Sequence, residues 1–310
     1  MNILFMGTPE FAVPCFEALA DNGYDICGAV TQPDKPAGRG HRLTPPPVKK
    51  AALARNIRVF QPETLRDNAF LAELQELRPE LIVVVAYGKI LPEYIINFPR
   101  IGCINMHASL LPKYRGAGPI QWAVINGEKK TGITSMMMEK GLDTGDMLLR
   151  CELEIGEYET AAQLHDRLMN AAAELLIKTV NGLENGTITP EKQDDSLSCY
   201  APMLDKETAK IDWGKPAREI INLIRGMNSW PIAHTECMGE RMKVYTAVFG
   251  RENAGGEPGE ILSAGESGIE VACGDGSSIL ICELQFAGTK AMKVCEYLNG
   301  HKIPVGEILK

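Results

Sequence analysis

The chain has 310 residues, of which 45% are hydrophobic and 23% charged, and its formal net charge is −8 at pH 7. This composition is that of an ordinary globular protein and excludes the disordered and fibrous classes, and the length favours two domains. The acidic balance excludes a surface that is basic overall, so any contact with nucleic acid requires a local cluster of positive charge.

The nine cysteines are scattered singly, without a C-x-x-C pair or a cluster of zinc ligands. They are expected to be reduced thiols, which is typical of a cytoplasmic protein. Residues 1–7 carry no basic leader, and the longest strongly apolar run, 81–87, is far shorter than the roughly 20 residues that cross a bilayer. We therefore expect a cytoplasmic monomer without a membrane span or a metal site.

In the first half of the chain, short apolar strands alternate with amphipathic segments, the pattern of βαβ units around a parallel sheet. Residues 81–86 are apolar at every position, as in a strand covered on both faces. No G-x-G-x-x-G follows the first strand, which disfavours a dinucleotide cofactor. The sequence predicts an α/β domain with a doubly wound, mostly parallel sheet. Its predicted strands are 2–6, 26–31, 58–60, 81–86, 102–107 and 132–139, and its predicted helices 11–21, 48–55, 68–77, 120–126 and 160–183.

A proline-rich segment, residues 33–47, interrupts this alternation. Its prolines exclude a helix or a central strand, so we expect a long loop. Lys35, Arg39 and Arg42 give the segment three basic side chains that can meet phosphates, and Arg39 lies between two glycines, which permit close approach. An ordinary surface loop explains the composition equally well.

Residues 190–204 are polar and irregular, and we place a linker there between domains 1–189 and 205–310. After a predicted helix at 216–227, five short strand candidates punctuated by glycine favour a small β-barrel. These candidates are 234–237, 242–249, 259–262, 268–273 and 278–284. The domain is acidic overall, and its local basic group comprises Lys206, Lys210, Lys215 and Arg218, although each taken singly is better explained as solvated surface.

Two polar residues, Asn105 and His107, occupy alternate positions near the C-terminal end of the predicted strand 102–107. Such residues share one face of a strand, and open α/β sheets build their sites at this end. An amide and an imidazole can stabilise an oxyanion and donate or accept a proton, as acyl transfer to an amine requires. Taken alone, the pair is better explained by a structural histidine and a strand-end cap.

Asp143 lies in the sequence Gly-Leu-Asp-Thr-Gly, whose two glycines allow a tight loop. Such a loop can present the carboxylate to an imidazole, where it would fix the histidine tautomer or accept a proton. A solvated aspartate in a turn is the competing interpretation.

Around these residues the sequence resembles the family of 10-formyltetrahydrofolate-dependent formyltransferases. The motifs that carry the resemblance are Asn-x-His-x-Ser-Leu-Leu-Pro at 105–112, Tyr-Arg-Gly-Ala-Gly-Pro at 114–119 and Gly-Leu-Asp-Thr-Gly-Asp at 141–146. The resemblance implies a Rossmann-like enzyme that uses 10-formyltetrahydrofolate as formyl donor, releases tetrahydrofolate and needs no metal. It also implies a catalytic trio of Asn105, His107 and Asp143 and a folate site lined by Ser109, Leu110, Leu111 and Pro112.

Residues 7–14 and 32–40, together with the second domain, most closely resemble the branch of this family that formylates the α-amino group of methionyl initiator tRNA for translation initiation. This resemblance implies that the 33–47 loop enters the acceptor end of the tRNA and that the second domain is an OB-fold-like β-barrel, a fold that often binds oligonucleotides. From their charge we expect Arg39, Arg42 and Lys206 to contact the tRNA. Two alternatives remain at this point. They are a formyltransferase that acts on a sugar nucleotide or ribotide, and a tRNA-binding protein whose catalytic domain is idle.

Overall fold

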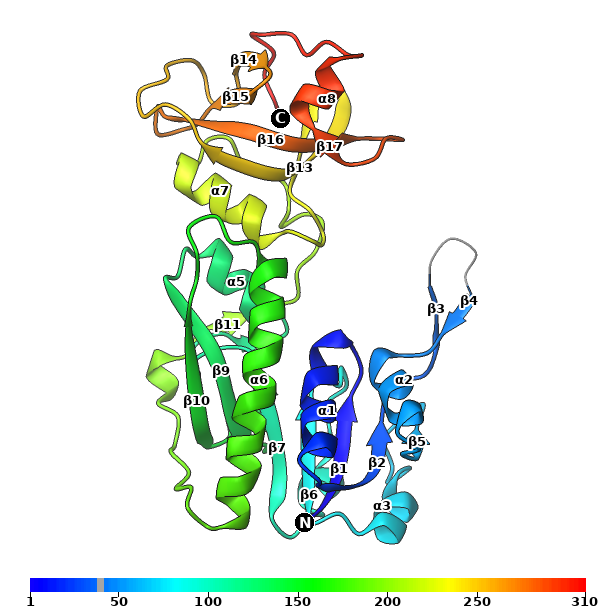
Figure 1. Cartoon of the computed structure of the whole chain (residues 1–310). Helices are drawn as coiled ribbons and strands as arrows, with labels where there is room; N and C mark the ends of the chain where they lie inside the picture. Colours follow the sequence, from blue (N-terminus) through cyan, green and yellow to red (C-terminus); the bar gives the residue numbers. More distant parts are fainter. Residues whose placement is uncertain (38–41) are drawn as a thin grey trace. The chain divides into compact units, whose positions relative to one another are not determined.

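The computed structural model describes residues 1–37 and 42–310 (Figure 1). The chain divides into two compact units, each assembled from three segments. The first comprises Met1–Gly116, Thr131–Leu153 and His165–Tyr200, and the second comprises Ala117–Lys130, Glu154–Leu164 and Ala201–Lys310. Both units are therefore discontinuous in sequence, and each is described by itself.

A seven-stranded sheet with the order β10-β9-β7-β6-β1-β2-β5 forms the centre of the first unit. The strands from β5 to β7 are parallel, whereas β9 runs antiparallel to β7. All five residues of β6 are buried, as expected of a strand that is covered on both faces. The strands are β1 (Asn2–Gly7), β2 (Asp25–Val30), β5 (Val59–Phe60), β6 (Leu81–Val85), β7 (Gly102–His107), β9 (Lys130–Met137) and β10 (Met147–Glu154).

Helices connect and flank these strands, and two of them begin with proline in the first turn, where the missing N–H costs no hydrogen bond. A short two-stranded ribbon made of β3 and β4 extends beyond α2 (Figure 1). The remaining elements are η1 (Glu10–Ala12), α1 (Val13–Asp21), β3 (Lys35–Ala37), β4 (Arg42–Thr44), α2 (Pro47–Ala54), α3 (Leu71–Leu77), α4 (Glu93–Ile96), β8 (Arg115–Gly116), α6 (Ala161–Glu184), η2 (Asp195–Leu197) and β11 (Tyr200–Ala201).

The predicted fold class is confirmed, since a mostly parallel α/β sheet is followed by an antiparallel barrel-like domain. Two details differ. Helix α3 starts at Leu71 instead of residue 68, because Asp67 and Asn68 have φ angles of 54° and 58°, outside the helical region. Strand β10 was not predicted, although its second half alternates between partly buried and exposed residues, the period-two signal of a half-buried strand.

The second unit is an antiparallel sheet with the order β12-β13-β16-β15-β14, to which β17 adds beside β16. Helices α5 and α7 pack together, and Gly226 leaves room for Ile125, which a Cβ atom at that position would meet at 2.5 Å. All five predicted strands are present, whereas β17 and α8 were not predicted. The elements are α5 (Pro119–Ile125), α7 (Ala217–Gly226), β12 (His234–Cys237), β13 (Glu240–Phe249), β14 (Ile261–Gly265), β15 (Gly268–Ala272), β16 (Ser278–Phe286), β17 (Met292–Lys293) and α8 (Val294–Leu298).

Across the described ranges, no helix combines the length and the apolar character that a membrane span requires.

Candidate active site

The candidate site lies at the C-terminal end of β7, in the first unit. Asn105 pairs with Val84 of the neighbouring β6 and with Met136 of β9, so it occupies the interior of the sheet. It is partly buried, and two residues later His107 is buried. Alternation along the strand directs both side chains to the same face, as predicted.

Two contacts fix the imidazole of His107. Its Nε2 atom lies 2.8 Å from the backbone oxygen of Tyr114, and its Nδ1 atom lies 3.7 Å from Oδ2 of Asp143. A carbonyl oxygen only accepts hydrogen bonds, so Nε2 carries the proton and the neutral ring has its lone pair on Nδ1. The histidine and aspartate side chains are 6% and 14% exposed, so both groups are largely shielded from solvent.

The loop that presents Asp143 depends on its glycines. Asp143 has a φ of 53°, a left-handed conformation that aspartate tolerates better than most residues. At Gly145, a Cβ atom would lie 1.9 Å from the backbone oxygen of Met137, and at Gly141 it would lie 2.0 Å from Oγ1 of Thr144. The predicted tight loop is present, and it turns the carboxylate toward the amide of Gly116, which donates to Oδ2 at 2.9 Å.

Two further residues hold this loop, and neither was predicted to have a role in the site. The amide nitrogen of Gln193 donates to the backbone oxygens of Asp143 and Gly145, both at 2.8 Å. Arg115 donates to the amide oxygen of Gln193 from Nε at 3.1 Å and from Nη2 at 2.8 Å. Arg115 was part of the motif at 114–119, whereas the predicted linker over 190–204 gave no reason to expect such a contact from Gln193.

The segment predicted to line a folate site divides into buried and accessible residues. Ser109 and Leu111 are buried, and the hydroxyl of Ser109 donates to the backbone oxygen of Lys113 at 2.6 Å. Leu110 and Pro112 are only partly buried. A ligand at this segment would therefore meet the apolar surfaces of Leu110 and Pro112 rather than the serine hydroxyl.

The three residues predicted to contact tRNA belong to different parts of the chain. Arg39 lies outside the described residues, and Arg42 begins β4, where it pairs with Ala37 of β3. In the second unit Lys206 is exposed. Of its predicted companions, Lys215 lies 3.6 Å from Glu219 and Arg218 lies 3.1 Å from Glu157, so part of this basic group is neutralised.

A polar cluster of Asp34, Lys49 and Gln61 holds the base of the β3–β4 ribbon. Lys49 Nζ lies 2.8 and 2.9 Å from the two carboxylate oxygens of Asp34 and 2.6 Å from Oε1 of Gln61. The amide of Gln61 donates to Asp34 and to the backbone of Gln32, both at 2.8 Å. The lysine and glutamine hold the pKa of the Asp34 carboxyl below its ordinary value. Since Asp34 precedes β3 and Lys49 follows β4, the cluster ties together both ends of the ribbon.

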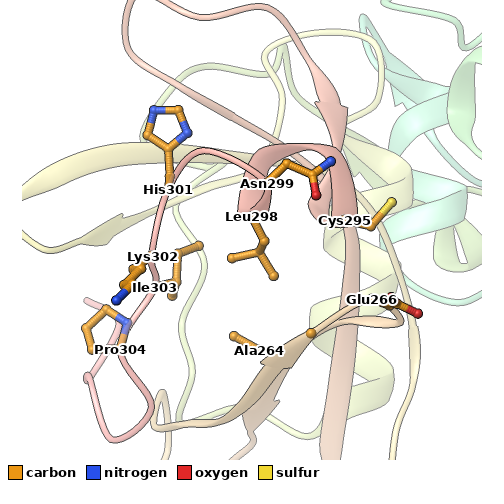
Figure 2. Close-up of a pocket in the computed structure, with 10 residues that line it drawn as sticks. Ala264, Glu266, Cys295, Leu298, Asn299, His301, Lys302, Ile303 and Pro304 are labelled. Carbon is orange, nitrogen blue, oxygen red and sulfur yellow. The ribbon is translucent and has the colours of Figure 1, made fainter.

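A separate pocket of about 660 Å³ lies within the second unit. Figure 2 shows that it lies between the loop at Glu266 and the chain that follows α8, with Leu298 and Ile303 directed into it. The residues that line it do not include Asn105, His107 or Asp143, so it is not the candidate active site.

Comparison with known proteins defines the class. Residues 1–180 match the family described as formyl transferase, and residues 203–302 match the formyl transferase C-terminal domain. The chain belongs to the formyl transferase family, which confirms the resemblance seen in the motifs.

Full-length relatives are more specific. The chain is 54% identical over 309 residues to the methionyl-tRNA formyltransferase of Alkaliphilus oremlandii (strain OhILAs), with 100% of this chain and 99% of the relative covered. It is 51% identical over 311 residues to the methionyl-tRNA formyltransferase of Clostridium novyi (strain NT), with both chains covered completely.

Solved structures support the fold. The N-formyltransferase from Helicobacter canadensis, in complex with folinic acid and dTDP-3-aminofucose, has a TM-score of 0.69 at 21% identity, covering 90% of this chain and 98% of the other. HypX from Aquifex aeolicus, in complex with tetrahydrofolic acid, has a TM-score of 0.66 at 14% identity, covering 99% of this chain and 50% of the other.

Proposed function

We propose that this chain transfers the formyl group of 10-formyltetrahydrofolate to the α-amino group of methionyl initiator tRNA. The products are N-formylmethionyl-tRNA, which serves translation initiation, and tetrahydrofolate. The observation that carries the proposal is the 54% identity, over the whole chain, to a methionyl-tRNA formyltransferase. The arrangement of Asn105, His107 and Asp143 provides the groups that this reaction needs, and we propose these three as the catalytic residues.

Asn105 and His107 stabilise the oxyanion. Attack of the amine on the formyl carbon places negative charge on the formyl oxygen, and a fixed donor beside that oxygen lowers the barrier. Among the described residues, no hydrogen bond engages the side chain of Asn105 elsewhere, so its amide is available as such a donor. His107 adds a second donor when its Nδ1 atom is protonated.

Asp143 accepts the proton of the attacking amine and then releases it. The Nδ1 atom of neutral His107 and the Asp143 carboxylate both accept hydrogen bonds, so a proton can lie between them. Asp143 accepts the proton that the amine loses as the new C–N bond forms. The same proton passes to N10 of the folate as the bond between the formyl carbon and N10 breaks, so that charge and atoms balance.

The fit to the donor substrate rests on Leu110 and Pro112. Both are partly buried and lie a few residues beyond His107, where their apolar surfaces can contact the flat face of the ring system of the donor. Holding the formyl carbon and the amine about 3 to 3.5 Å apart can then supply several kcal/mol of the rate acceleration. We therefore assign the donor site to the segment from Ser109 to Pro112.

We propose that the β3–β4 ribbon, with Arg39 and Arg42, and Lys206 of the second unit contact the tRNA. Basic side chains on a proline-stiffened segment suit phosphate contacts, which position an RNA without reading its sequence. The variant Arg39→Ala should then raise the KM for methionyl-tRNA and leave slow hydrolysis of the formyl donor unchanged. Equal loss of both activities would count against an RNA role for this residue.

Transfer of a labelled formyl group tests the function. The purified chain and labelled 10-formyltetrahydrofolate are offered charged initiator tRNA, uncharged tRNA, and amino sugars linked to nucleotides. We expect label only on the charged tRNA. Label on an amino sugar alone would assign the chain to a different formyl acceptor, and binding of tRNA without transfer would make it an RNA-binding protein.

A cytoplasmic location and a monomeric state complete the proposal. Charged initiator tRNA is a cytoplasmic substrate in bacteria, the source of the relatives named above. Sedimentation equilibrium at several concentrations should give the mass of one chain, 33.9 kDa, and twice this mass would contradict the monomer.

A further inference from the structure

We infer that Arg115 and Gln193 are positioning residues that set the orientation of the Asp143 carboxylate. The inference rests on the proposed function, since it assumes that Asp143 takes part in formyl transfer. Among the described residues, neither side chain forms a hydrogen bond with His107. They act instead on the backbone of the loop that carries Asp143.

The hydrogen-bonding capacity of the Gln193 amide is fully used. Its two N–H groups donate to the backbone oxygens of Asp143 and Gly145, and its oxygen accepts two bonds from the guanidinium of Arg115. Because a guanidinium only donates and a carbonyl oxygen only accepts, the amide has one permitted orientation. The Arg115–Gln193 pair therefore fixes two peptide groups of the loop, Asp143–Thr144 and Gly145–Asp146, in one arrangement.

The hydrogen bonds between Arg115 and Gln193 are more buried than ordinary hydrogen bonds on a protein surface. The residues around Gln193, from 191 to 200, are exposed, whereas Gln193 itself is partly buried. The side chain of Arg115 is 12% exposed, and its Nη2 atom also contacts Oδ1 of Asp195 at 2.7 Å. A charged hydrogen bond in such a partly dry environment is stronger than one on the surface, and it is costly to leave unmade.

The backbone next to Arg115 contacts two of the three proposed catalytic residues. The carbonyl oxygen of Tyr114 accepts the proton of His107 Nε2, and the amide of Gly116 donates to the carboxylate of Asp143. The side chain between them reaches the same aspartate through Gln193. One three-residue segment thus fixes the histidine ring, the carboxylate and the loop backbone relative to one another.

The variant Gln193→Met tests the inference, because methionine keeps the length of the side chain and removes all four hydrogen bonds. A small displacement of a catalytic group can cost about 10²-fold in rate. We expect kcat for methionyl-tRNA to fall about 10- to 100-fold, with both KM values within about twofold of wild type. Gln75→Met, at an exposed position of α3, is the matched control and should leave kcat unchanged.

A double-mutant cycle separates positioning from general destabilisation. If Gln193 acts through Asp143, then Gln193→Met should cost less than about twofold in single-turnover rate once Asp143→Asn is present, because the effects of coupled residues are not additive. The full loss in the Asp143→Asn background, or a wild-type kcat in Gln193→Met alone, would overturn the inference.

Arg115→Lys gives a second measurement if Gln193→Met does not fold. Lysine keeps the positive charge but lacks the planar fork that binds the glutamine oxygen, so we expect kcat to fall several-fold below wild type, with a smaller loss once Asp143→Asn is present. An unchanged kcat in Arg115→Lys would also contradict the inference. If the wild-type chain formylates a different amine, the proposed function fails, but the same cycle run on that amine still tests the pair.

Discussion

The Nε2 atom of His107 lies 2.8 Å from the carbonyl oxygen of Tyr114, and this contact determines which ring nitrogen remains available for proton transfer. Nε2 is committed to a backbone acceptor, so Nδ1 is the atom that lies beside Asp143. The nitrogen available to the proposed reaction is therefore set by the chain beyond the strand, and the strand itself sets only the face on which the ring projects.

This relationship predicts different outcomes for two amide replacements of His107. Asparagine places its amide near the position of Nδ1, whereas glutamine reaches toward that of Nε2. We expect His107→Asn to retain more turnover than His107→Gln, and His107→Ala to lose about 10² to 10³ in kcat. Steady-state kinetics with methionyl-tRNA measure the order, and the reverse order of the two amides would show that Nε2 is the reactive atom. Nitrogen NMR of the ring should independently report a proton on Nε2.

Removal of the proposed oxyanion donor should affect turnover without affecting folding. We expect Asn105→Ala to lower kcat by about 10² to 10³ while the KM for methionyl-tRNA changes little, since the amide acts on charge that develops during the reaction. The thermal midpoint should stay within about 4 °C of wild type, because the side chain is only partly buried. A near-wild-type kcat would remove Asn105 from the proposed site.

The strand that carries the site could be predicted from sequence because its signals are local. Residues 102–107 form β7 with the predicted bounds, and the two glycines around Asp143 indicated the loop correctly. The contacts of Gln193 could not be predicted, since they join residues 50 and 48 positions apart and leave no periodic pattern. Likewise, the acceptor of the His107 proton is a backbone oxygen, and a carbonyl group has no signature in a sequence.

The polar cluster at the base of the ribbon should make the stability of the chain depend on pH. Hydrogen bonds from Lys49 and Gln61 hold the folded-state pKa of Asp34 below its ordinary value of 3.8. The stabilisation from the carboxylate is therefore present above that value and is lost as the pH falls through the lower folded-state pKa. Asp34→Asn should lower the thermal midpoint at about pH 7, and the difference from wild type should shrink toward about pH 3.

Asp34→Asn should also raise the KM for methionyl-tRNA several-fold, because the ribbon loses the anchor at its base. The control Asp21→Asn removes a surface partner of Arg55 and should leave this KM unchanged. A constant difference in midpoint at all pH values would mean that Asp34 contributes by packing rather than by charge.

A buried hydroxyl without a partner offers a stability prediction. The phenol oxygen of Tyr87 has no hydrogen-bond partner among the described residues, and burial raises the pKa of Tyr87 to about 12. A buried polar group left unsatisfied costs about 1 to 3 kcal/mol, so Tyr87→Phe should raise the free energy of unfolding by roughly 1 kcal/mol. Urea denaturation measures the change.

Tyr94→Phe is the matched control, because the Tyr94 hydroxyl accepts a hydrogen bond from the amide of Phe70 at 3.1 Å. The same substitution there should lower the free energy of unfolding by about 1 kcal/mol. If Tyr87→Phe also destabilises the chain, the phenol oxygen has a partner, such as a bound water molecule, that offsets its burial.

The loop that presents Asp143 should not tolerate a side chain at Gly145. A Cβ atom there would lie 1.9 Å from the backbone oxygen of Met137, so the backbone on one side must move. Since Gly145 also accepts a hydrogen bond from Gln193, the movement breaks that bond and turns Asp143 away from His107. We expect Gly145→Ala to lower kcat at least about 10-fold.

Gly300→Ala, where a Cβ atom meets no other atom within 4 Å, controls for the added methyl group and should be neutral. Full activity in Gly145→Ala would mean that the loop adapts without moving the carboxylate, and Asp143 would then not depend on its backbone for orientation.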